Sequence, residues 1–162
     1  MIDVETEDTI LRVFILFVQT ARAALKYADT HLYREVGFSA VKLVVLQVLA
    51  SNNGTMTPSQ IAKWTHTERH NITTLVERMR QNGLVITERN AKDKRVVNVT
   101  LTDKGRELLC RAMPAAREVV NQVMLSITEG DAALLEKPLS VLRQNAYHGL
   151  EIPANHRPPL PD

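Results

Sequence analysis

A group of charged side chains lies in the short stretch TERNAKDKRVVNV, residues 87–99. The residues on both sides of the group favour β-strands, so the sequence predicts a β-hairpin with the charges at its tip. A hairpin tip buries very little, and its positive charges are therefore expected to meet a negatively charged partner outside the protein. The candidate contact residues of this tip are Arg89, Lys92, Asp93, Lys94 and Arg95.

The charge distribution along the chain supports this expectation. The net charge of the 162 residues is only +2. Residues 57–111, however, hold 11 basic and 6 acidic side chains, whereas residues 1–56 hold 5 and 6 and residues 112–162 hold 4 and 6. A basic module between neutral or acidic segments is typical of proteins that bind nucleic acid.

Two predicted helices precede the hairpin. Thr57 has the features of an N-cap, Pro58 suits the first helical position, and Gln60 can complete a capping box. This start predicts a short helix to about residue 64, a tight turn over 65–67, and a longer helix over 68–82 that Gly83 ends. Helix, turn, helix and hairpin together predict a winged helix-turn-helix, whose second helix lies in the major groove of double-stranded DNA.

The second helix has one apolar and one polar face. Helical spacing turns Ile72, Leu75, Val76 and Met79 toward a core. The polar face carries groups that can bond to base edges or phosphates, and Glu77 in its second half would repel phosphate, so its N-terminal half is expected to read DNA. An ordinary solvated polar face is the alternative interpretation, and the neighbouring hairpin favours DNA binding. The candidate contact residues of this helix are Arg69, His70, Asn71, Thr73, Thr74 and Arg78.

The flanking segments predict a mainly α-helical protein with a small β-wing. An N-terminal dimerisation helix is expected in residues 1–36, the winged helix-turn-helix domain in 37–101, C-terminal dimerisation helices in 102–150, and a proline-rich tail in 151–162. The first helix is apolar around so much of its circumference that a second subunit is expected against it. Ser39 is positioned to cap the next helix, which is almost wholly apolar and should form the centre of the core.

The stretch IAKWTHTERHNITTLVERMRQNGLVITERNAKDKRVVNVTLTDKGREL resembles the MarR family of transcription regulators. The resemblance implies a homodimer on a pseudo-palindromic operator, and repression that a small phenolic or other aromatic effector relieves. By position it implies base reading by His70, Asn71, Thr73 and Thr74. It also implies that Arg95 enters the minor groove and that Asp93 steadies it.

The turn between the two helices departs from the family pattern. A leucine and a glycine are usual where this chain has Thr65 and His66, and a small cap is usual where it has Glu68, which makes Thr67 the alternative cap. Trp64 stands at a position that is normally polar. These differences leave the fold intact but affect the angle at which the recognition helix leaves the turn.

The sequence does not identify an effector. In the family its pocket lies where the first, second and fifth helices meet the winged domain, so Arg22, His31 and Lys42 are the candidate lining residues. For each of them the alternative interpretation, a surface charge or a satisfied polar group, is the simpler one.

Several other functions lack support in the sequence. The five histidines are scattered without metal-ligand spacing, and no phosphate loop, nucleophile elbow or catalytic carboxylate pair is present, so neither an enzyme nor a metal or cofactor is expected. One cysteine, and no readable signal peptide or transmembrane helix, indicate a cytoplasmic protein. Two alternatives remain: a winged-helix protein-interaction module, and an architectural protein that binds DNA without sequence preference.

Overall fold

The computed structural model describes residues 8–90 and 93–152. The predicted contact residue Lys92 and residues 153–162 of the predicted proline-rich tail lie outside these ranges. The fold is mainly α-helical with a small sheet, as predicted. The elements in chain order are α1 (Thr9–Val36), α2 (Ala40–Ser51), β1 (Thr55–Met56), α3 (Pro58–Thr65), α4 (Arg69–Gln81), β2 (Val85–Arg89), β3 (Val97–Leu101), α5 (Asp103–Val123) and α6 (Glu129–Gly149).

The core of the winged domain surrounds α2. Val45, Leu46 and Leu49 of this helix are completely buried, which confirms that it is the central core helix. α3, α5 and the sheet contact α2, and α4 packs against α3 and β2. Buried aliphatic side chains of these elements, such as Ile61, Ile72 and Val99, belong to the same cluster. The core thus fixes the position of α4 relative to the sheet. The recognition helix and the hairpin, which are the two elements predicted to contact DNA, therefore have a defined arrangement.

The sheet is antiparallel, with the strand order β1-β3-β2. β2 and β3 form the predicted hairpin, and their pairing runs from Val85 opposite Leu101 to Arg89 opposite Val97 at the outer end. The two-residue strand β1 was not predicted. It pairs Thr55 with Thr100, and the hydroxyls of these two threonines lie 3.0 Å apart.

The helix ends follow the sequence signals in some places and not in others. The capping box of α3 is present as predicted: Thr57 accepts from the backbone of Gln60, whose side chain accepts from the backbone of Thr57. Gly83, at a φ of 72°, follows the end of α4 as predicted. Ser39 occupies the N-cap position of α2 but makes no side-chain capping bond. Asp29 of α1 caps α2 instead, accepting from the backbone N–H of Ala40 at 2.9 Å.

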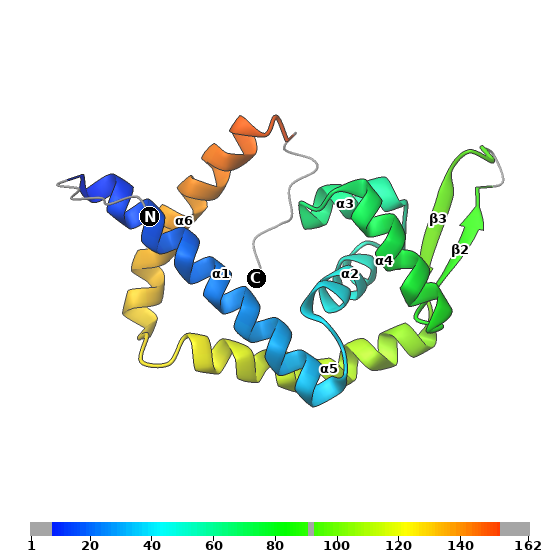
Figure 1. Cartoon of the computed structure of the whole chain (residues 1–162), viewed down its shortest axis with the longest axis horizontal. Helices are drawn as coiled ribbons and strands as arrows, with labels where there is room; N and C mark the ends of the chain where they lie inside the picture. The colour runs from blue at the N-terminus through cyan, green and yellow to red at the C-terminus, as the bar shows by residue number, and fades with distance from the viewer. Residues whose placement is uncertain (1–7, 91–92, 153–162) are drawn as a thin grey trace.

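The molecule has two arms. Figure 1 shows the winged domain on one side, α1 with α6 on the other, and α5 running between them. The element boundaries at Val36, Leu101 and Gly149 lie at or beside the predicted segment boundaries. The division into dimerisation and DNA-binding segments remains a prediction.

Candidate nucleic-acid interface

The recognition helix α4 presents two chemically distinct faces, as predicted. Ile72, Val76 and Met79 are buried, and Leu75 is half-buried beside them. The six candidate contact residues, from Arg69 to Arg78, are all exposed. Core packing therefore orients the polar face outward.

The threonine hydroxyls on this face already have acceptors within the helix. Thr73 donates to the carbonyl of Arg69 at 3.0 Å, and Thr74 donates to the carbonyl of His70 at 3.2 Å. Because a hydroxyl has one proton and two lone pairs, both threonines are left with acceptor capacity toward the outside. They are therefore suited to accept hydrogen bonds from the amino groups of bases.

The side chains in the second half of the polar face form hydrogen bonds with one another. Glu77 accepts two hydrogen bonds from the guanidinium of Arg80, at 2.7 and 2.9 Å, and one from Gln81. The hydrogen bond from Arg80 is the main reason why the pKa of Glu77 lies below its ordinary value. The negative charge of Glu77 is thus engaged, and His70, Asn71 and Thr74 in the first half remain for contact with a partner.

Asp93 organises the described part of the wing tip. Its carboxylate accepts from the backbone N–H of Arg95 at 2.9 Å, and its carbonyl accepts from the backbone of Val96. The backbone of Asn90 in turn donates to the carbonyl of Val96 at 2.8 Å. Asp93 therefore holds Arg95 through the main chain, and the Arg95 side chain is exposed.

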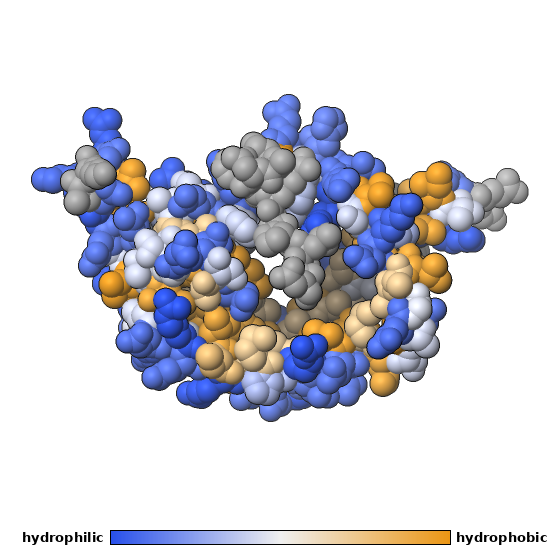
Figure 2. All heavy atoms as spheres, turned by 180° about the vertical axis from the view of Figure 1, so that it is seen from behind, coloured by the Kyte–Doolittle hydropathy of each residue, from blue (hydrophilic) through white to orange (hydrophobic). Residues whose placement is uncertain are grey.

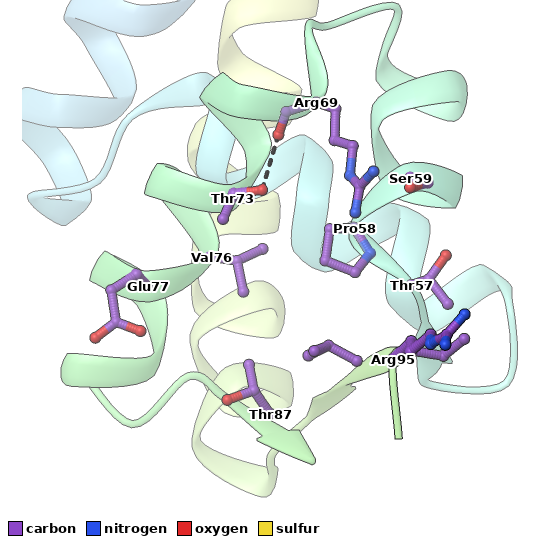
Figure 3. Close-up of a pocket in the computed structure, with 11 residues that line it drawn as sticks. Thr57, Pro58, Ser59, Arg69, Thr73, Val76, Glu77, Thr87 and Arg95 are labelled. Carbon is purple, nitrogen blue, oxygen red and sulfur yellow. Dashed lines mark hydrogen bonds between the residues drawn. The ribbon is translucent and has the colours of Figure 1, made fainter. Parts of the chain in front are cut away.

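A groove of about 470 Å³ separates α4 from the wing. Arg69 and Thr73 line it from the helix, and Arg95 lines it from the wing. Figure 3 shows the Arg69 side chain extending from α4 toward Pro58 and Ser59, with Arg95 close to Thr57. Two elements that are separate in sequence therefore bring two guanidinium groups to one groove.

The start of α3 is part of this groove and was missed as a candidate contact. Thr57 and Ser59 line the groove together with the two arginines. The sequence indicated only a capping role for Thr57, and no local signal could show that the wing lies beside it. The other side of α4 borders a smaller hollow lined by His70, Asn71, Thr74 and Arg78, so the candidates lie on both sides of the helix axis.

The basic side chains of this surface are not neutralised by neighbours. Within residues 8–90 and 93–152, the ion pairs are Arg34 with Glu35 and Arg80 with Glu77. The other positive groups of α4 and the wing form none with described residues, so their charge is available to a polyanion. These groups are Arg69, Arg78, Arg89, Lys94 and Arg95.

The structure gives two of the three effector candidates partners within the protein. Nδ1 of the buried His31 lies 3.0 Å from the Arg34 guanidinium, and its ring lies against that of Tyr27. The Lys42 ammonium lies 5.2 Å from the centre of the Phe38 ring. Arg22 is exposed on α1. An effector-binding role for the three residues remains a prediction.

No cluster of three or more histidine, cysteine, aspartate or glutamate side chains suited to a metal ion occurs among the described residues. Over the same residues, no helical segment combines the length and the apolar character that crossing a bilayer requires.

Comparison with known proteins agrees with this geometry. The model of the MarR family matches residues 36–96. The chain is 32% identical to the uncharacterised HTH-type transcriptional regulator YkoM of Bacillus subtilis, over 67% of this chain and 71% of that protein.

Two solved structures are similar over most of the chain. Sco3205, a MarR family transcriptional regulator from Streptomyces coelicolor in complex with DNA, is 26% identical with a TM-score of 0.77, over 90% of this chain and 89% of that one. The organohalide-sensing regulator RdhR-CbdbA1625, with 2,4-dichlorophenol bound, has the same fold with a TM-score of 0.82 at 24% identity, over 99% of this chain and 94% of that one. This chain therefore belongs to the MarR family of DNA-binding transcription regulators, which are not enzymes.

Proposed function

We propose that the protein is a homodimeric, sequence-specific transcriptional repressor of the cytoplasm, released from its operator by a small organic effector. The observation that carries the proposal is the joint placement of α4 and the wing around one groove, with Arg69 and Arg95 both free of ion pairs with described residues. A helix of major-groove dimensions beside a positively charged wing is suited to read one operator half-site.

The contacts divide into two kinds. Exposed basic side chains of α4 and the wing supply affinity by neutralising phosphates, and Lys92 is assigned to this group from the sequence alone. His70, Asn71, Thr73 and Thr74 supply specificity, because they lie on the N-terminal half of the exposed face of α4. Arg95 is assigned to the minor groove, where negative potential favours an arginine.

The exposed apolar surface of the flanking helices supports dimerisation. A single chain leaves a band of large hydrophobic side chains on its flanking helices exposed to solvent, and exposed apolar surface of this kind marks protein–protein interfaces. Part of it is visible in orange in Figure 2. Its members include Ile10, Phe14, Leu16 and Leu25 of α1, Val120 of α5, Leu125 in the turn between α5 and α6, and Leu134 of α6. A second copy of the chain would bury this band and bring two recognition helices to half-sites roughly 34 Å apart.

Repression and release rest on the family resemblance. A dimer that occupies an operator overlapping a promoter excludes polymerase, which is the simplest route to repression. The structurally similar RdhR-CbdbA1625 binds 2,4-dichlorophenol, and this supports a phenolic or aromatic effector here. A thermal-shift screen with aromatic acids and phenols tests the effector, because a ligand of the folded state raises the melting temperature.

Gel-shift titration at several salt concentrations tests DNA binding and both alternatives. The expected result is a steep, linear fall of log affinity with log salt for a selected duplex, with a slope of about −0.9 for each phosphate neutralised. A protein-interaction module would give no shift. An architectural protein would show the salt dependence with equal affinity for all duplexes. Light scattering at the same protein concentrations should give twice the 18.2 kDa chain mass.

A further inference from the structure

His66, in the turn before the recognition helix, has an unusual backbone conformation. It ends α3 with φ at 51° and ψ at 37°, in the left-handed region that glycine adopts most easily. A side chain at such a position persists when the surrounding structure holds it there. The backbone N–H of His66 donates to the carbonyls of Ala62 and Lys63, which closes the end of α3, and the exposed side chain of His66 adds a second restraint through a contact at the surface.

That contact is with Tyr147 of α6. Nε2 of His66 lies 3.0 Å from the Tyr147 hydroxyl, and the two ring centres are 4.9 Å apart. Partial burial lowers the pKa of His66 below its ordinary value, which favours the neutral imidazole. Tyr147 is only 7% exposed, and it is the single buried residue of α6, all of which the structure describes.

The pair lies where α4 begins. Glu68 occupies the N-cap position of α4 without a side-chain capping bond. The predicted alternative cap is also absent, because the Thr67 hydroxyl donates to the carbonyl of Thr65. The start of the recognition helix therefore lacks the local side-chain restraint that a cap ordinarily supplies. The end of α6 borders the same region, since Leu150 and Ile152 line a cavity of about 680 Å³ together with Thr67, Glu68 and Arg69.

We propose that His66 and Tyr147 are positioning residues for operator binding: their ring pair fixes the angle at which α4 leaves the turn and ties it to α6. The inference rests on the proposed reading of the operator by α4. Base contacts require α4 at a defined angle, whereas attraction to phosphates depends mainly on charge. Loss of the pair therefore weakens binding to the operator and leaves binding to unrelated DNA unchanged.

Tyr147→Phe tests the hydrogen bond while keeping the ring. The probes are a duplex selected from a random library by the wild-type protein and a scrambled duplex of the same length. We expect about fivefold weaker binding to the selected duplex, the effect of one hydrogen bond, and equal binding to the scrambled one. Tyr33→Phe, which removes a hydroxyl from an exposed tyrosine of α1, is the matched control and should leave both affinities unchanged.

His66→Gly tests the other partner, because glycine tolerates the left-handed backbone. The double variant should bind the selected duplex no more weakly than the weaker single variant, since the two residues act as one unit. Unchanged operator affinity in Tyr147→Phe would overturn the inference. A parallel loss on both duplexes, or additive effects in the double variant, would also overturn it, since these outcomes indicate general destabilisation or independent roles.

Hydrogen–deuterium exchange on the free protein tests, in the absence of DNA, whether the His66–Tyr147 contact restrains the start of α4. Tyr147→Phe should speed exchange at the amides of Thr67 and Ile72, whose hydrogen bonds to Ala62 and Glu68 span the turn and the first turn of α4. Unchanged exchange there would contradict the link. If the wild-type protein selects no duplex, the proposed operator reading fails, and the exchange result still tests the His66–Tyr147 contact by itself.

Discussion

The backbone N–H of Arg95 donates a hydrogen bond of 2.9 Å to the carboxylate of Asp93 at the tip of the wing. The carboxylate therefore shapes the main chain of the tip and leaves the arginine side chain exposed. This arrangement separates the residue that positions the main chain from the residue proposed to contact DNA, and the two can be tested separately.

Arg95→Ala should weaken operator binding by more than about tenfold, because the guanidinium would leave the negative potential of a narrow minor groove. The melting temperature should not change, since the side chain is exposed. Gel-shift titration at fixed salt measures the affinity. Arg111→Ala, which removes an exposed arginine from α5, is the matched control. Equal affinities of Arg95→Ala and the wild type would exclude a role for this side chain.

Asp93 can be tested with a pair of substitutions. Asp93→Asn and Asp93→Ala both remove a negative charge, but only alanine removes the acceptor for the Arg95 backbone. The alanine variant should therefore bind the operator more weakly than the asparagine variant in the same gel-shift assay. If the two variants bind alike, the hydrogen bond to Arg95 does not matter for DNA binding.

Substitutions on the exposed face of α4 should change the preferred sequence. His70→Ala and Thr73→Ala are each expected to relax or alter the preference at one or two base pairs per half-site, by about 1–3 kcal/mol. Selection from a random DNA library measures the preference. Gln81→Ala is the control, because Gln81 lies in the second half of α4 and donates a hydrogen bond to Glu77 of the same helix. An unaltered motif in both test variants would rule out base reading by these side chains.

Glu77 and Arg80 give a pH dependence of stability whose sign follows from the lowered pKa. The hydrogen bond from Arg80 lowers the pKa of Glu77 below the ordinary value of 4.5. The contribution to stability is therefore complete above pH 4.5 and is lost as the pH falls through the lowered value. Glu77→Gln should lower the melting temperature at pH 7 and have progressively less effect toward pH 3.

The Arg80→Gln background is the control for this measurement. With the partner removed, Glu77→Gln should have little effect at either pH. A difference between wild type and Glu77→Gln that does not vary with pH, or that persists without Arg80, would contradict the assignment.

Gly105 at the start of α5 has no room for a side chain. A Cβ there would clash with the carbonyl oxygen of Leu84 and would lie 2.7 Å from a methyl group of Leu101. Gly105→Ala should therefore lower the free energy of unfolding by about 1–3 kcal/mol, the usual cost of overpacking, as measured by urea unfolding. Gly149→Ala is the matched control, because a Cβ at that position of α6 meets nothing within 4 Å. Equal stability of the two variants would contradict the clash.

The winged domain could be predicted well because its signals are local. The capping box at Thr57, the glycine at position 83 and the periodicity of α4 each act within a few residues along the chain. Features that depend on distant partners were missed. β1 exists because Thr55 and Met56 pair with β3, and α2 is capped by Asp29 from α1 rather than by the adjacent Ser39.

The turn before α4 also differs from the sequence-based expectation. Thr67 was the alternative cap of α4, but its hydroxyl donates to the carbonyl of Thr65 within the turn. The sequence marked His66 only as a residue that differs from the family pattern. Its contact with Tyr147 could not be predicted, because the two residues are 81 positions apart in the sequence.

Selection of DNA sites from a random library by the purified protein tests sequence-specific binding. We predict an enriched pseudo-palindromic motif whose half-site centres lie about one helical turn apart, roughly 34 Å, with one recognition helix on each. Binding to that motif should fall steeply with salt and should be lost before the protein unfolds. A library that remains unenriched, while the protein is folded and dimeric, would contradict sequence-specific binding by α4 and the wing.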